Sequence, residues 1–139
     1  MISRVLVPMD DSEMAERALR YALEVHPDAD VTVLHVVGGP SSMMGDATTL
    51  ALADDPEVAA REHASETLDR AHDIAAEADR DISTAVEVGP PARMIAESAS
   101  EFDAVVLGSH SGGLADRLLV GDVAGTVVRR SPVPVTVVR

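Results

Sequence analysis

The sequence contains no cysteine, no lysine and only two aromatic residues, Tyr21 and Phe102. Without cysteine, the chain can form neither a disulfide nor a thiolate nucleophile nor a cysteine-ligated zinc site. The shortage of aromatic side chains means that valine, leucine, isoleucine and alanine must fill the core, with methionine as an adaptable filler. The 139 residues contain no linker between two periodic regions, so we expect a single domain, residues 1–139.

Positive charge is also scarce. All eleven basic residues are arginines, against 24 acidic residues, which gives a formal net charge of −13. Nucleic acids and anionic membranes need clustered basic residues on a partner, so this balance argues against both. An acidic excess without lysine fits the cytoplasm of an extreme halophile, because molar salt screens the self-repulsion over about 3 Å. We therefore expect a halophilic protein.

Long hydrophobic runs are missing as well. None approaches the ~20 residues that a membrane span requires. The apolar run near the N-terminus, residues 2–7, is too short for the core of a signal peptide and leads directly into Asp10 and Asp11. We therefore expect a soluble, cytoplasmic protein.

Short apolar runs alternate with stretches of helical periodicity. The first run ends at Pro8, and Asp11 or Ser12 can then cap a helix. A loop-like insertion at Ser41–Pro56 interrupts the alternation. The pattern predicts strands at 4–8, 30–37, 81–88, 104–107 and 133–138, and helices at 13–25, 57–79 and 122–130, with a further helix that begins near Pro91 and buries Phe102. Five strands separated by four helices indicate an α/β fold with a doubly wound parallel sheet.

A loop rich in glycine and serine separates the fourth predicted strand from the last helix. The strand ends at Gly108, and the helix begins near Gly121. The backbone of a small-residue loop approaches an anion closely, and a helix N-terminus adds unpaired N–H groups and a positive dipole end. Open α/β sheets bind their ligands in such loops, at the carboxyl ends of parallel strands. The alternative is that Gly108 and Gly121 only permit tight turns.

Four segments of the chain carry a family resemblance. They read RVLVPMDDSEMAERAL, VTVLHVV, VEVGPPARMIAESASEFDAVVLGSH and LADRLLVGDVAGTVVRRSPVPVTVVR, and in this order and spacing they resemble the universal stress protein (UspA-like) family. The resemblance covers nearly the whole chain. It implies an open five-stranded parallel sheet of order 3-2-1-4-5 with helices on both faces, the adenine nucleotide alpha hydrolase-like fold, and a dimer joined through the last strand.

Family members that bind ATP carry the pattern G-x-x-G, nine residues, then G-S or G-T. In this sequence the pattern falls on Gly108, Ser111, Gly121 and Asp122, so two positions differ. Ser111 places a side chain where backbone and phosphate approach closely, although its hydroxyl can donate a hydrogen bond. Asp122 places a carboxylate where a phosphate-bonding hydroxyl is expected.

The negative charge of Asp122 is expected to repel the phosphates of a bound nucleotide. Two unit charges about 4 Å apart repel by about 1 kcal/mol in water and about 4 kcal/mol at an effective dielectric of 20. A Mg²⁺ ion bound with the nucleotide can bridge Asp122 to the phosphates and turn this repulsion into coordination. Alternatively, Asp122 only stabilises its own helix as an acid in the first turn.

The resemblance implies a nucleotide site at the carboxyl ends of the first and fourth strands. Its residues are Pro8, Met9, Asp10, Val36, Leu107, Gly108, Ser111, Gly121, Asp122 and Val123. An aspartate at the end of a strand can accept hydrogen bonds from ribose hydroxyls, which gives Asp10 a physical role in the site. The alternative for Asp10 is a turn or capping acid.

The last strand predicts the assembly. As the terminal strand of a 3-2-1-4-5 sheet it lies at an edge, where unpaired N–H and C=O groups favour pairing with another chain. Pro134 removes one donor without abolishing the strand. We expect a homodimer joined by antiparallel pairing through Val133, Val135 and Val137.

Nucleophilic catalysis has little support in the sequence. Around Ser111, Ser109 occupies the position where the G-x-S-x-G elbow requires glycine. The five histidines all precede Ser111, so the order serine, acid, histidine of α/β-hydrolases is impossible.

The remaining histidines give no metal site. His63, Asp69, His72 and Asp73 share a predicted helix, but they contain no histidine pair at i,i+4, so we interpret them as a solvated face. His35, inside the second predicted strand, is expected to be a hydrogen-bonded core histidine.

Three classes of function remain. The first is a stress-response module that binds ATP or another adenine nucleotide and signals as a dimer. The second is an interaction protein that has lost nucleotide binding through Ser111 and Asp122. The third is a hydrolase or phosphotransferase, which ranks last because no activated nucleophile is present.

Overall fold

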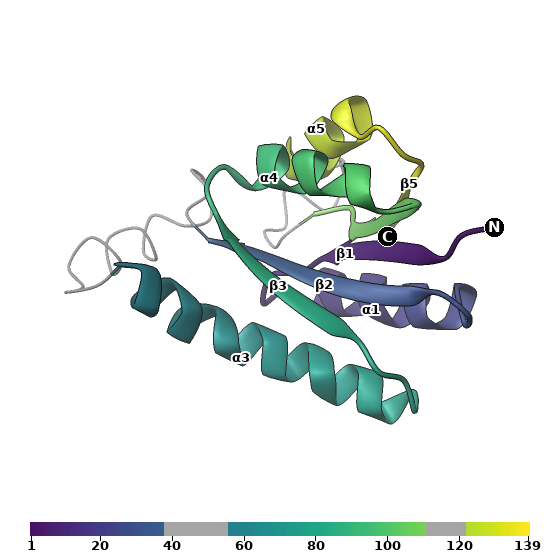
Figure 1. Ribbon diagram of the computed structural model, residues 1–139, viewed down its shortest axis with the longest axis horizontal. Helices are drawn as coiled ribbons and strands as arrows, with labels where there is room; N and C mark the ends of the chain where they lie inside the picture. The colour runs from purple at the N-terminus through teal and green to yellow at the C-terminus, as the bar shows by residue number, and fades with distance from the viewer. Residues whose placement is uncertain (38–55, 111–121) are drawn as a thin grey trace.

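The computed structural model describes residues 1–37, 56–110 and 122–139, in which strands and helices alternate (Figure 1). The strands are β1 (Arg4–Pro8), β2 (Asp30–Val37), β3 (Ser83–Val88), β4 (Ala104–Gly108) and β5 (Val135–Val138). The helices are α1 (Glu13–Val25), α3 (Pro56–Glu77), α4 (Pro91–Ser98) and α5 (Asp122–Arg130), and a 3₁₀ turn at Ala99–Glu101 follows α4. The predicted insertion Ser41–Pro56 lies, except for Pro56, outside the described residues.

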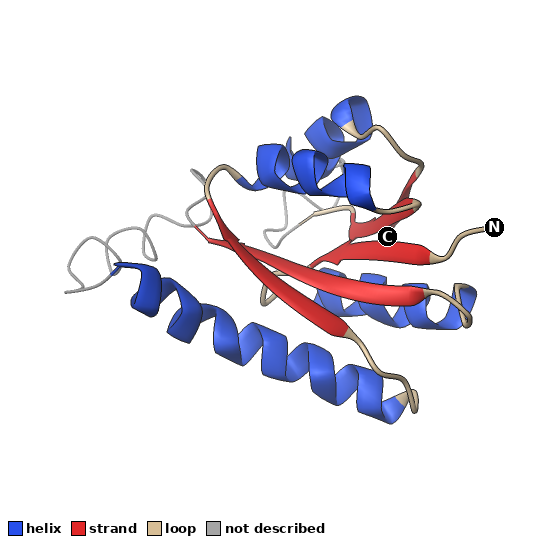
Figure 2. Cartoon of the chain, viewed as in Figure 1, coloured by secondary structure: helices blue, strands red, loops and turns tan. Residues whose placement is uncertain are grey.

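The strands form one parallel sheet in the order β3-β2-β1-β4-β5. Helices α1 and α3 cover one face of the sheet, and α4 and α5 cover the other (Figure 2). This is the strand order and the layering that the sequence predicted, so the fold prediction is confirmed. The central strands β1 and β4 are neighbours in space although about 100 residues separate them in the sequence.

Alternating side chains of the central strands supply both halves of the core. In β1, Val5 and Val7 pack with buried residues of α1 and α3, whereas Leu6 packs with those of α4 and α5. Successive strand residues point to opposite faces, and both faces of the sheet are covered at its centre, so β1 after Arg4 and all of β4 are apolar. The largest fully buried side chains are leucine, isoleucine and valine, as the shortage of aromatics predicted. Within the part of the chain that is described, no helix combines the length and the apolar character that crossing a bilayer would take.

The C-terminal end of α1 is held by Arg80, which lies in the turn after α3. The guanidinium of Arg80 donates to three backbone carbonyls, those of Leu23 at 2.8 Å, Ala29 at 2.8 Å and His26 at 3.3 Å. These carbonyls belong to the last turn of α1 and to the loop that leads into β2, so they have no helical partner of their own. Arg80 therefore fixes α1 against the start of the sheet.

β3 begins two residues later than predicted, at Ser83 instead of Asp81. The reason is the turn that ends α3. Asp79 adopts a positive φ of 56°, and the N–H of Arg80 donates back to the carbonyl of Ala75 at 2.9 Å. This return of the chain is a common way to terminate a helix, and it delays the pairing with β2.

β5 also begins later than predicted, and Val133 precedes it. The N–H of Val133 donates to the hydroxyl oxygen of Ser131 at 3.2 Å, and that hydroxyl donates to the carbonyl of Val133 at 2.8 Å. Both backbone groups are therefore bonded in a local turn next to Pro134. The inclusion of Val133 in the last strand was wrong, whereas Val135 and Val137 lie in β5.

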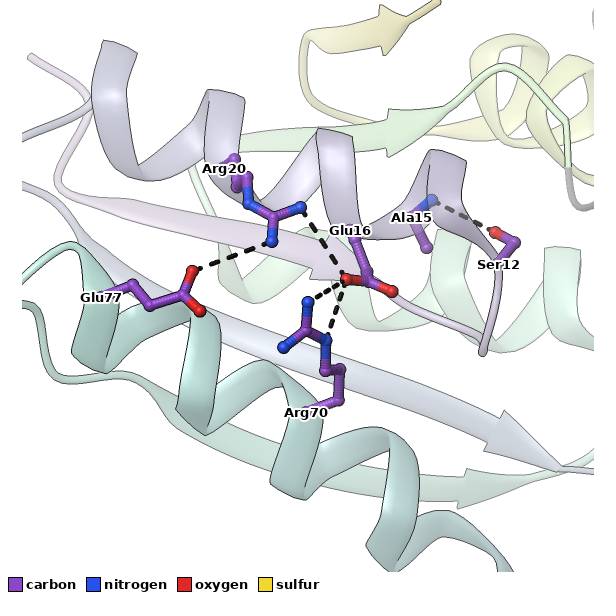
Figure 3. A network of polar contacts seen from close by, with 6 residues as sticks. All are labelled: Ser12, Ala15, Glu16, Arg20, Arg70 and Glu77. Carbon is purple, nitrogen blue, oxygen red and sulfur yellow. Dashed lines mark hydrogen bonds and ion pairs between the residues drawn. The ribbon is translucent and has the colours of Figure 1, made fainter.

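Ion pairs join α1 to α3 (Figure 3). One carboxylate oxygen of Glu16 accepts a hydrogen bond from Nε of Arg70 at 2.9 Å and lies 2.9 Å from Nη2 of the same side chain. Arg20 lies between Glu16 and Glu77, with a guanidinium nitrogen 3.8 Å from a carboxylate oxygen of each. Asp69, His72 and Asp73 are exposed on α3, as predicted for a solvated face, whereas the side chain of His63 lies outside the described part of the structure.

Candidate functional site

The carboxyl ends of β1 and β4 form the point at which the sheet changes its winding direction. Val5 and Leu6 of β1 pair with Ala104 and Val105 of β4. After β1 the chain continues through α1 on one face, and α5 lies on the other face between β4 and β5. The connections therefore diverge, and open α/β sheets bind ligands in the crevice that this divergence creates.

Asp10 is the charged side chain that follows β1. It is partly buried, and its Oδ1 accepts a hydrogen bond from the N–H of Ser12 at 2.9 Å. Ser12 in turn caps α1, because its hydroxyl accepts from the N–H of Ala15 at 3.2 Å. The alternative for Asp10, a turn acid, is therefore correct for Oδ1. Within the described residues no bond engages Oδ2, which leaves that oxygen available to a ligand.

His35 fixes the backbone on which Asp10 is mounted. Its side chain is 3 % exposed, and its Nδ1 lies 2.9 Å from the carbonyl oxygen of Met9. The N–H of Met9 donates to the carbonyl of Leu34, also at 2.9 Å. Both backbone groups of Met9 are thus held by β2. The prediction that His35 is a hydrogen-bonded core histidine is confirmed. Through Met9, His35 fixes the backbone that precedes Asp10.

Gly108 ends β4 beside the first turn of α1. A Cβ atom at this position would lie 2.6 Å from Cγ of Met14 and 3.1 Å from both the backbone carbonyl carbon and the oxygen of Met14. Among the described glycines, a positive φ occurs at Gly89 and not at Gly108. Gly108 is therefore required by a close approach between strand and helix, and the tight-turn alternative does not explain it.

The apolar residues predicted to surround the nucleoside are buried. Val36 and Leu107 pack together on the face of α4 and α5, and Met9 packs on the face of α1 and α3. Pro8 is buried at the end of β1. Because these side chains are buried, the partly buried carboxylate of Asp10 is the polar side chain that the end of β1 can offer to a ligand.

Asp122 is the first residue of α5, and its side chain is exposed. An acid in the first turn interacts favourably with the positive end of the helix dipole, and Arg129 and Arg130 complement the other end. Val123 is half-buried and packs against the core on the α4 and α5 face. The exposure of Asp122 places its charge in a high-dielectric environment, so its effect on a nearby phosphate is closer to the lower of the two values expected from the sequence.

His110 is a residue of this edge that the sequence reasoning used only to exclude a catalytic triad. It follows Gly108 and Ser109 at the end of β4, and its side chain is half-buried. Its Nδ1 atom is buried and has no hydrogen-bond partner among the residues that the structure describes. The motif S-H at the end of the strand is visible in the sequence, but burial of one ring nitrogen is a tertiary property that no sequence pattern indicates.

Comparison with known proteins decides the family. The sequence model of the universal stress protein family matches residues 1–139. The chain belongs to this family. No curated protein matches the chain in sequence.

Solved structures of universal stress proteins share the fold. UspA from Lactobacillus plantarum is 26% identical, with 99% of this chain and 98% of that chain covered and a TM-score of 0.76. A universal stress protein in complex with cAMP is also 26% identical, with 99% and 97% covered and a TM-score of 0.66. The universal stress protein from Archaeoglobus fulgidus in complex with dAMP is 24% identical, with 100% and 98% covered and a TM-score of 0.69, and it shows the shared fold.

Two of the four positions of the phosphate pattern lie in the described part of the chain. Gly108 and Asp122 lie at the ends of β4 and α5 that face the same edge of the sheet, whereas Ser111 and Gly121 lie outside the described residues. The described part of the chain contains no group of three or more histidine, aspartate or glutamate side chains able to hold a metal ion. At the carboxyl ends of the strands, Asp10 can accept hydrogen bonds from hydroxyl groups, and a ring N–H of His110 can donate one to an anion.

Proposed function

We propose that this universal stress protein binds an adenine nucleotide at the carboxyl ends of β1 and β4, and that it acts as a dimeric stress-response module. The proposal is supported by family membership and by the related structure in complex with cAMP. It is also supported by the geometry of the edge, where a carboxylate follows β1 and a close-packed glycine ends β4.

The observation that carries the proposal is the state of Asp10. A structural turn acid needs only one oxygen, and Ser12 engages Oδ1 alone. The second oxygen lies at the switch point of the sheet on a backbone that His35 and β2 hold in place. A fixed carboxylate oxygen at this position suits a ribose, whose two adjacent hydroxyls are both donors.

The phosphates extend from this nucleoside end toward the N-terminus of α5. Unpaired N–H groups of the first turn attract them, and the exposed carboxylate of Asp122 repels them. A monophosphate therefore suits the site in the absence of metal. For ATP, we propose that Mg²⁺ arrives with the nucleotide and that Asp122 contributes a ligand to it.

The dimer forms through β5. This strand lies at the edge of the sheet and pairs with β4 on one side. Its residues are all half-buried in the single chain, which supports a strand whose second side is completed by another copy.

The test compares binding by wild type, Asp10→Asn and Asp30→Asn. Asparagine keeps the acceptor for the N–H of Ser12 but removes the charge, so the turn before α1 survives. Asp30 is an exposed acid at the start of β2, at the amino ends of the strands and therefore far from Asp10. Its replacement by asparagine also removes one negative charge. Calorimetry in molar KCl with AMP, cAMP and ATP, and with GMP as a base control, measures the affinities.

We expect Asp10→Asn to weaken AMP and ATP by roughly ten- to a hundredfold, the usual range for a hydrogen bond to a charged group. It should weaken cAMP by no more than this, because cAMP keeps only the 2′-hydroxyl of its ribose as a donor. Asp30→Asn should bind as wild type does. Unchanged affinity in Asp10→Asn would place the ligand elsewhere. If wild type binds none of the nucleotides, the alternative takes its place, an interaction protein that has lost nucleotide binding through Ser111 and Asp122.

A further inference from the structure

The sheet has two outer strands, and β3 is the one opposite β5. It pairs with β2 at every residue from Ser83 to Val88, so no bulge interrupts it. In the described part of the chain, no strand lies on its outer side. Proteins protect such strands with prolines, lysines or bulges, because the outer backbone groups otherwise pair with another chain. β3 has none of these three features, so its outer side is open to a partner.

The backbone groups on the outer side of β3 belong to alternate residues. The N–H of Gly89, directly after the strand, donates to the carbonyl of Val37 in β2 at 2.9 Å. In a parallel ladder every second residue directs its backbone groups to the same neighbour, so Glu87 also faces β2. The residues that direct their N–H and C=O groups outward are therefore Thr84, Val86 and Val88.

The two faces of β3 carry different side chains. Val86 and Leu68 pack against the same small cluster between α3 and the sheet, and Val88 shares this face by alternation and is 58 % exposed. On the opposite face, Ala85 packs with the core beneath α4, and Glu87 is exposed. Neighbouring strands favour apolar pairs and pairs of opposite charge. A strand added beside β3 would therefore meet apolar side chains on one face and a carboxylate on the other.

We propose that the outer side of β3 binds an extended segment of a partner protein by strand addition, and that this segment alternates apolar and basic residues. Its main chain bonds the outward backbone groups, and its alternate side chains provide specificity. The apolar side chains lie beside Val86 and Val88, and the basic ones lie beside Glu87. A second copy is disfavoured as the occupant because each copy carries a net charge of −13. This interaction is independent of nucleotide binding.

The experiment measures the fluorescence anisotropy of the labelled peptides VRVRVR and VEVEVE, which have the length of β3, with wild type and three variants in molar KCl. Thr84→Pro removes an outward N–H at an exposed residue of an edge strand, where proline is tolerated. Glu87→Arg reverses the exposed charge and keeps the backbone. Val137→Pro places proline in β5, the other outer strand, and serves as the matched control. Sedimentation gives the oligomeric state of each protein.

We expect wild type to bind VRVRVR about three- to tenfold more tightly than VEVEVE, the range for exchanging a cross-strand pair of opposite charge for one of like charge. Thr84→Pro should lose about tenfold in affinity for VRVRVR, because one main-chain hydrogen bond is removed. Glu87→Arg should prefer VEVEVE, and Val137→Pro should bind as wild type does. Since Glu87→Arg keeps the backbone, its reversed preference tests the proposal even if Thr84→Pro fails to fold.

Three results would overturn the proposal. The first is a wild type that does not bind VRVRVR, or that binds it no better than Thr84→Pro does. The second is an equal affinity of Glu87→Arg and wild type for both peptides, which would exclude a basic partner beside Glu87. The third is a Thr84→Pro that sediments as a smaller species than wild type, because a second copy would then occupy the outer side of β3.

Discussion

Gly108 at the end of β4 lies so close to Met14 in the first turn of α1 that no side chain fits between them. An added Cβ would approach the Met14 backbone to 3.1 Å and Cγ to 2.6 Å. The flexible end of a methionine can move aside, but the backbone of a capped helix turn cannot move without disturbing Ser12 and Asp10. The glycine therefore sets the distance between the strand and the helix that frame the candidate site.

The first prediction follows for Gly108→Ala. We expect a loss of about 1–3 kcal/mol in the free energy of unfolding, because the added methyl group forces a shift of packed backbone. Gly125→Ala is the control, since its Cβ would meet only the flexible end of Arg129, at 3.3 Å, and alanine favours the helix by up to ~1 kcal/mol. Urea unfolding in molar KCl measures both. Equal stability of Gly108→Ala and wild type would contradict the account of this contact.

Asp103 supplies a prediction about acid stability. Its Oδ2 accepts hydrogen bonds from the N–H groups of Ser3 and Arg4, both at 2.9 Å, and these bonds lower the pKa of Asp103 below its ordinary value. A carboxylate with a depressed folded-state pKa contributes stability above its unfolded-state pKa, and this contribution is lost as the pH falls through the folded-state pKa. The loss should therefore occur below about pH 4, the ordinary range of an aspartate.

The comparison of Asp103→Asn with Asp30→Asn tests this. Asp103→Asn should have a lower free energy of unfolding than wild type at pH 7. This difference should shrink as the pH is lowered from about 4 toward about 2, because the carboxylate of wild type becomes protonated over roughly that interval. Asp30→Asn removes an equal charge, also at the amino ends of the strands. Its difference in stability from wild type should not shrink in this way as the pH falls. Chemical unfolding at several pH values provides the measurement. A constant gap between Asp103→Asn and wild type over this interval would show that the charge of Asp103 is not the cause.

The fold was predictable from the sequence because it depends on local patterns. Apolar runs marked the buried strands, helical spacing marked α1, and Ser12 was one of two residues expected to cap it. Two strand starts were predicted two residues too early. The observed starts, Ser83 and Val135, depend on turns made by contacts outside the strands. A left-handed Asp79 and the hydroxyl of Ser131 decide them, and apolar patterns carry no information on either.

The candidate site was predictable only in part. Family resemblance placed Asp10, Gly108 and Asp122, but it gave a phosphate role to Gly108, whose close contact is with Met14. The burial of Nδ1 of His110 and the bond from His35 to Met9 join residues of different strands, so they appear only once the chain is folded. Ser111 and Gly121 remain predictions, since they lie outside the described residues.

The ion pairs between α1 and α3 give a prediction about salt. Glu16 bonds Arg70 and raises the pKa of that guanidinium, and it also lies beside Arg20. A double-mutant cycle with Glu16→Gln and Arg70→Met should give a favourable coupling in dilute buffer that declines in molar KCl, because salt screens exposed charges. The net charge of −13 acts in the opposite sense, so wild type itself should gain stability with salt. Equal stability of wild type in dilute buffer and in molar KCl would argue against a halophilic protein.

The dimer prediction concerns the outward side of β5. The carbonyls of Pro134 and Val138 accept from β4, so the alternate residues Val135 and Val137 direct their backbone groups away from it. Val137→Pro removes an outward N–H and should give a monomer, while wild type should sediment as a dimer at micromolar concentration in high salt. Val86→Pro alters β3, at the other edge of the sheet, and should remain dimeric. A monomeric wild type would exclude assembly through β5 at these concentrations.

Asp122 gives the last prediction, which separates nucleotides by their phosphates. Its exposed carboxylate at the start of α5 should make AMP rival ATP when no metal is present. Mg²⁺ should raise ATP affinity steeply and change AMP affinity little, because only the longer phosphate chain can share the ion with Asp122. Asp122→Ser should strengthen metal-free ATP binding by about 1 kcal/mol, or roughly fivefold, the value for one exposed like charge at about 4 Å. Asp30→Ser, at the far edge of the sheet, should have no effect. Calorimetry with and without Mg²⁺ decides between these outcomes. If Asp122→Ser leaves ATP binding unchanged in both conditions, the carboxylate lies too far from the phosphates to act on them, and its role reduces to stabilising its own helix.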